Sequence, residues 1–93
     1  MNLVRKNATQ TYEVKGVKYT LTATAQYEQG KAVSSINGGM VRSDQKMVAS
    51  FNRYSPENLN VNFTSVEVTE QADILAEINA FVSAIEADVN SNI

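Results

Sequence analysis

Ser43 and Lys46 come closest to a catalytic spacing in this chain. They have the S-x-x-K arrangement of acyl enzymes, in which a lysine assists a serine nucleophile. Here, however, the two residues fall in a segment that we expect to be a hairpin turn, so no helix would present the serine. The chain also contains no His and no Cys, and therefore lacks both the usual general base near neutral pH and a thiolate nucleophile. We expect that the protein is not an enzyme.

Ligands for metals and phosphates are equally sparse. The sequence has no Asp-x-Asp run of the calcium-loop type and no glycine-rich loop with P-loop spacing. Thiolate and imidazole ligands are absent as well. We expect no cofactor and no metal site.

The most distinctive chemical pattern is a group of carboxylates near the C-terminus. At roughly 100° per residue in a helix, four of them fall on one flank. This acidic flank consists of Glu70, Asp73, Glu77 and Asp88. No lysine accompanies them, although like charges four residues apart destabilise a helix by about 0.2–0.5 kcal/mol per pair. The neighbouring outer face carries only small side chains, Ala76, Ala80, Ala84 and Ala87, which would let another backbone approach. The flank is the predicted contact surface for a protein partner with a basic surface.

The cations are confined to the other half of the chain. Residues 1–53 hold all eight Lys and Arg side chains and three carboxylates, whereas residues 54–93 hold seven carboxylates and no cation. Basic side chains beside aromatic rings are the ingredients of a surface for single-stranded nucleic acid. The residues predicted for this alternative are Lys18, Lys46, Arg53 and Tyr54, with Tyr54 the aromatic side chain expected on the open face of a sheet.

Apolar and polar residues alternate along the first two thirds of the chain, which predicts strands. The clearest alternation covers 17–28, and further strands are expected over 8–15, 32–42, 46–54 and 59–64, with Met47 and Phe51 on the buried face. The connections are too short for crossovers, so the strands form an antiparallel meander of four to five strands. Gly38-Gly39 interrupts the third one and indicates a bulge, a bend or a close approach of backbones.

Apolar residues at helical spacing follow the strands. They predict one amphipathic helix from about Glu70 to Asp88, with Thr69 as its N-cap. Its apolar stripe consists of Ile74, Leu75, Ile78, Phe81, Val82, Ile85 and Val89. The stripe must cover one face of the sheet, which gives a two-layer α+β fold. We expect a single domain over 1–93, with 1–7 and 90–93 frayed.

The favoured function is a non-enzymatic protein–protein interaction module, such as a small adaptor or inhibitor of the kind encoded by phages and mobile elements. A nucleic-acid-binding domain is one alternative. A homo-oligomeric structural protein, pairing through an edge strand or the Thr-rich sheet face, is another, so the chain is expected to be a monomer or a homodimer. Residues 2–7 lack the apolar run of a signal peptide and no segment has the roughly 20 apolar residues of a membrane span. We expect a cytoplasmic protein without a membrane partner.

Overall fold

Five strands and one helix follow one another along the residues that the structure describes. The computed structural model describes residues 7–28, 31–55 and 57–91. The elements are β1 (Asn7–Lys15), β2 (Tyr19–Glu28), β3 (Val33–Arg42), β4 (Met47–Ser55), β5 (Asn58–Phe63) and α1 (Val68–Asn90). Asn7 opens β1 and Asn90 closes α1, while the rest of the segments expected to fray, apart from Ser91, lies outside the described residues.

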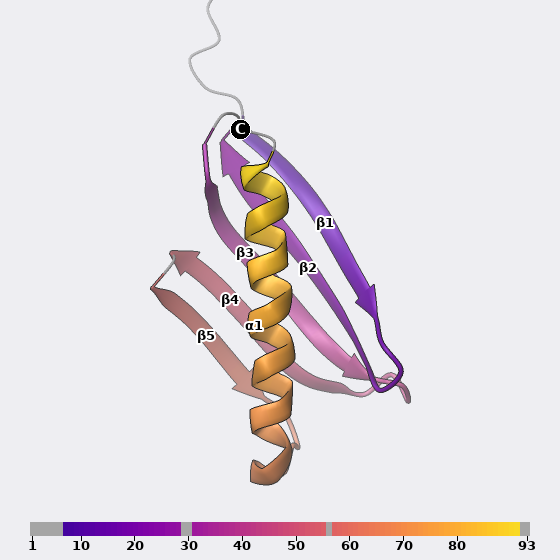
Figure 1. Ribbon diagram of the computed structural model, residues 1–93. Helices are drawn as coiled ribbons and strands as arrows, with labels where there is room; N and C mark the ends of the chain where they lie inside the picture. Colours follow the sequence, from indigo (N-terminus) through magenta and orange to yellow (C-terminus); the bar gives the residue numbers. More distant parts are fainter. Residues whose placement is uncertain (1–6, 29–30, 56, 92–93) are drawn as a thin grey trace, which may run out of the picture.

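The strands form one antiparallel sheet in the order β1-β2-β3-β4-β5. The helix α1 packs on one face of this sheet, over β2 and β3 (Figure 1). The core lies between these two layers, and within the described part of the chain no helix covers the opposite face of the sheet. The predicted two-layer α+β meander with a C-terminal helix is thereby confirmed.

The side chains of β2 follow the predicted alternation closely. Leu21, Ala23 and Ala25 are buried beneath the helix, while Thr22 and Gln26 are exposed on the open face. Tyr19 is buried with them. The prediction fails at Val17, which belongs to the turn between β1 and β2 and is fully exposed. In the sequence, Val17 extends the apolar–polar alternation of β2, but in the structure it lies outside the sheet.

A bulge reverses the expected faces at the start of β4. The pairing of β3 with β4 shifts where Met40 and Val41 meet Ala49 and Met47, so β4 has one residue more than β3 at this point. As a result Val48 is buried and Met47 is more than half exposed, the opposite of what simple alternation predicts.

The helix begins earlier than expected and without a side-chain cap. Its N-cap is Glu67, which has extended backbone angles, and Thr69 lies within the first turn, so the predicted cap was wrong. The buried stripe contains Ile74, Ile78, Phe81, Val82, Ile85 and Val89. Leu75, at the margin of that stripe, remains 38% exposed and is a correction to the predicted core. No helix of the part of the chain described here is long and apolar enough to cross a membrane.

At the glycine pair in β3, the side chains of the two neighbouring strands come close to the backbone of β3. Ala23, Gly38 and Phe51 stand opposite one another on β2, β3 and β4, and the register is unbroken there. A Cβ on Gly38 would lie 2.7 Å from both the Ala23 Cβ and the tip of the Phe51 ring, and against the Thr22 carbonyl oxygen. The missing side chain gives the ring room to lie across the sheet and meet Phe81 edge-on, with centroids 6.3 Å apart.

We predict opposite outcomes for alanine at the two glycines. G38A should lower the free energy of unfolding by about 1–3 kcal/mol, because the new methyl group overlaps backbone and a packed ring. In G39A the methyl group would lie 3.4 Å from the Met47 Cε, in ordinary contact, so the change should stay within about 0.5 kcal/mol. Urea denaturation measures both values. Equal effects of the two substitutions would contradict the packing of Phe51 across Gly38.

Candidate protein-interaction site

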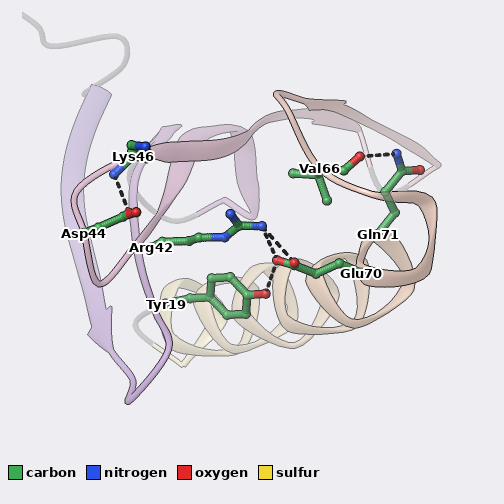
Figure 2. Close-up of polar contacts among 7 residues, drawn as sticks. All are labelled: Tyr19, Arg42, Asp44, Lys46, Val66, Glu70 and Gln71. Atoms are coloured by element: carbon green, nitrogen blue, oxygen red, sulfur yellow. Dashed lines mark hydrogen bonds and ion pairs between the residues drawn. The ribbon is translucent and has the colours of Figure 1, made fainter.

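Glu70, in the first turn of α1, is held by two side chains of the sheet. Tyr19 and Arg42 stand opposite each other on β2 and β3. The Tyr19 hydroxyl donates a hydrogen bond of 2.5 Å to Glu70 Oε2, and Arg42 Nη2 donates to Oε1 and Oε2 at 2.8 and 2.7 Å (Figure 2). Nearby, the Gln71 side-chain amide donates to the Val66 carbonyl at 3.4 Å, which ties the start of the helix to the preceding loop.

This contact shifts the pKa of Glu70 and that of Tyr19. The hydrogen bond from Tyr19, and then that from Arg42, holds the pKa of Glu70 below its ordinary value. Burial, followed by the hydrogen bond to Glu70, raises the pKa of Tyr19. The expectation that the acidic flank has no cationic partner is therefore wrong for Glu70. Its partner lies 28 residues away on β3 and is brought to it only by folding.

Asp88 makes a similar contact at the other end of α1. It accepts a hydrogen bond of 2.7 Å from the Tyr12 hydroxyl on the edge strand β1. Burial, and then this hydrogen bond, raises the pKa of Tyr12 to about 12. Tyr12 stays protonated at physiological pH and remains a donor to the helix. Two members of the predicted acidic flank, Glu70 and Asp88, thus fasten the helix to the sheet.

A third carboxylate of α1, outside the predicted flank, pairs with Arg53 of β4. Arg53 Nε lies 2.6 Å from Glu86 Oε1, although its N–H is not aimed well enough to form a hydrogen bond. Arg53 Nη1 donates to the Val33 carbonyl at 3.3 Å. The residue is only 4% exposed because it points toward the helix. Its predicted place on a nucleic-acid surface was therefore wrong.

The other residues of that alternative do not form one surface. Lys18 lies in the turn between β1 and β2, with its ammonium 5.3 Å from the centre of the Tyr19 ring. Lys46 is exposed immediately before β4, where its backbone amide donates to Asp44 (Figure 2). Tyr54 is exposed, as predicted, but near the opposite end of β4. The ring beside Lys18 belongs to Tyr19, which is buried, and the exposed Tyr54 lies near the other end of β4 from Lys46.

An apolar groove of about 400 Å³ lies between α1 and the β1–β2 hairpin. It is lined by Val14, Leu21, Ala76, Glu77, Ala80, Phe81 and Ala84. Leu21 and Phe81 are buried, whereas Val14, although apolar, is 49% exposed. The alanines form the side of the groove that belongs to the helix. The small outer face of the helix was apparent in the sequence, but the groove was missed, since it depends on where the helix lies on the sheet.

Asp73 and Glu77 are the two carboxylates of the predicted flank that the fold leaves available. Both are exposed, and Glu77 lines the groove. Within 7–28, 31–55 and 57–91, neither forms an ion pair or a hydrogen bond through its side chain. The acidic flank is therefore divided between two carboxylates that anchor the helix and two that face solvent, of which Glu77 lines the apolar groove.

The described residues contain no cluster of three or more acidic, His or Cys side chains that could hold a metal ion. Comparisons with models of protein families, with curated proteins and with solved structures find no match.

The Arg53–Glu86 pair predicts a stability effect that an exposed carboxylate does not show. E86Q leaves the buried guanidinium of Arg53 without its counter-charge and should lower the free energy of unfolding. We expect a loss of about 1–3 kcal/mol, less than for a fully buried pair, because Glu86 is partly exposed. E77Q, which removes an unpaired carboxylate, should change it by less than about 0.5 kcal/mol. In the double variant R53M/E86L, apolar packing should restore part of the loss. Chemical denaturation showing no difference between E86Q and E77Q would refute the pairing.

Glu70 predicts a dependence of stability on acid pH. The pKa of Glu70 is lower in the folded chain than its ordinary value of 4.5. As the pH falls, the carboxylate therefore stays ionised in the folded chain at pH values at which it is already protonated in the unfolded chain. Its contribution to stability is complete above the unfolded pKa and is lost as the pH falls through the folded pKa. Denaturation midpoints followed downward from about pH 6 should fall less steeply in E70Q than in the wild type. E77Q serves as the control and should keep the wild-type slope. A wild-type slope in E70Q would contradict the assignment.

Proposed function

We propose that the protein is a non-enzymatic, cytoplasmic protein-interaction module that binds a partner in the groove between α1 and β1. The partner segment combines apolar side chains with Lys or Arg. The groove accepts the apolar part, and Asp73 and Glu77 attract the cations. The observation that carries this proposal is the juxtaposition of an open apolar groove with carboxylates that the fold does not use.

Both parts of the surface support recognition rather than chemistry. Exposed apolar side chains in a concavity gain free energy when a partner removes them from water, by about 25 cal/mol per Å² of buried apolar area. Unpaired carboxylates at the rim favour a basic partner and speed its encounter. The binding role first expected for all four residues of the acidic flank is accordingly assigned to Asp73 and Glu77, since Glu70 and Asp88 already bind the sheet.

A selection from random peptides displayed on phage tests this function. We expect the immobilised protein to enrich peptides that contain apolar residues together with Lys or Arg. Synthetic copies of those peptides should bind A80W about tenfold or more weakly, because the indole fills the groove. The charge reversal D73K/E77K should weaken them similarly at low salt.

A72W is the matched control for this selection. Ala72 is also an exposed alanine of α1 but does not line the groove, so A72W should bind the peptides like the wild type. Enriched peptides that bind A80W and D73K/E77K as tightly as A72W would place recognition elsewhere and refute the proposal. Failure to enrich any peptide with this composition would refute it too.

A further inference from the structure

The helix covers only part of the apolar face of the sheet. A helix is about 10 Å wide with its side chains, while strands are about 4.8 Å apart, so one helix spans two or three strands. Here α1 lies over β2 and β3 (Figure 1). On the helix-facing side of β1, Tyr12 is half-buried and Val14 is 49% exposed. The helical layer therefore ends before the sheet does.

The wall of the groove has the spacing of a surface for helix packing. Ala76, Ala80 and Ala84 recur every four residues and stand along one side of α1, facing the groove. Small side chains in such a row let the axis of a second helix approach to about 8 Å. From Ala76 to Ala84 the axis of α1 advances by about 12 Å, which corresponds to two to three turns of a neighbouring helix. The floor is apolar where Val14 and Leu21 stand opposite each other on β1 and β2.

Charge distinguishes between the possible occupants. The helix α1 carries five carboxylates and no Lys or Arg. A second copy that packed its own α1 into the groove would bring Asp73 and Glu77 toward the same carboxylates, which costs free energy. A helix with Lys or Arg beside its apolar stripe would instead place opposite charges at this rim. The groove thus favours a basic partner over self-association.

From this geometry we infer that the occupant of the groove is a basic amphipathic helix of a partner protein, which lies alongside α1 and completes the helical layer over β1 and β2. The inference rests on the proposed interaction function and specifies the partner class. Leucine-like side chains of the partner contact Val14, Leu21 and Phe81. Its cations meet Glu77 within the groove and Asp73 beside it.

Two synthetic peptides of identical leucine and lysine composition test this inference. One has leucine at helical spacing and the other has leucine and lysine in strict alternation. Each is titrated into ¹⁵N-labelled protein, and the amide shifts are followed. We expect the helical pattern to shift the signals of Val14, Leu21 and Ala80, and to bind about tenfold or more tightly than the alternating peptide. In A80W its affinity should fall about tenfold or more, while A72W should match the wild type.

The remaining outcomes separate the partner class from the function. If the alternating peptide binds as tightly and shifts the amides of Thr9, Thr11 and Glu13 on the edge strand β1, the partner adds as a strand. The helix is then ruled out while the interaction function stands. If light scattering shows that the protein alone is a dimer and that A80W is a monomer, a second copy fills the groove and the inference is overturned. If neither peptide perturbs the groove, both the inference and the proposed function fail.

Discussion

A single helix about 10 Å wide lies on a five-stranded sheet about 19 Å across, and this difference in width governs the rest of the structure. Side chains directly beneath α1, such as Leu21, Ile36 and Phe51, are fully buried. Those on the two outer strands, such as Val14 of β1 and Val61 of β5, keep part of their surface in water. The apolar groove beside β1 is a direct result, because α1 is the one helix in residues 7–28, 31–55 and 57–91 and it does not cover that strip.

Polar contacts fix the position of so narrow a helix. A stripe of apolar side chains gives little directional preference, whereas hydrogen bonds and ion pairs hold only in one geometry. Glu70 meets Tyr19 and Arg42 near the start of α1, Glu86 meets Arg53, and Asp88 meets Tyr12 near its end. Because Arg53 is buried and Arg42 partly so, the sheet needs carboxylates above it. This need accounts for Glu70 and Glu86, two of the five carboxylates of the helix, without any partner.

This structural requirement does not explain Asp73 and Glu77. They lie on the same flank of α1 as Glu70 and Asp88, yet both are exposed to solvent, and Glu77 lines the groove. Neither carboxylate is needed to hold the helix on the sheet. The exposure of both carboxylates, and the place of Glu77 in an apolar groove, are the physical basis of the proposed interaction function.

Local patterns predicted the elements but not their contacts. Alternation in β2 and the helical spacing of Ile74, Ile78 and Ile85 identified the strand and the stripe correctly, since both reflect burial on one face. Alternation failed at Met47, where a bulge depends on how two strands pair and leaves no mark in the sequence of either.

The candidate site, too, could be predicted from local patterns only in part. The common flank of the helical carboxylates followed from helix geometry alone. That Arg42 and Tyr12 would reach two of them depended on sheet register and on the placement of α1, which are long-range properties. Arg53 shares the parity of the buried Phe51 in β4 and is buried with it, although the nucleic-acid alternative grouped it with basic residues at strand ends and turns.

The placement of α1 over β2 and β3, with the groove on its β1 side, is the central claim, and a spin label tests it most directly. The chain has no Cys, so A80C provides a unique attachment point for the label. Paramagnetic broadening of amide signals should then be strongest at Val14 and Leu21 and distinctly weaker at Val61 on β5. Stronger broadening at Val61 than at Val14, or equal broadening across the sheet, would contradict the account.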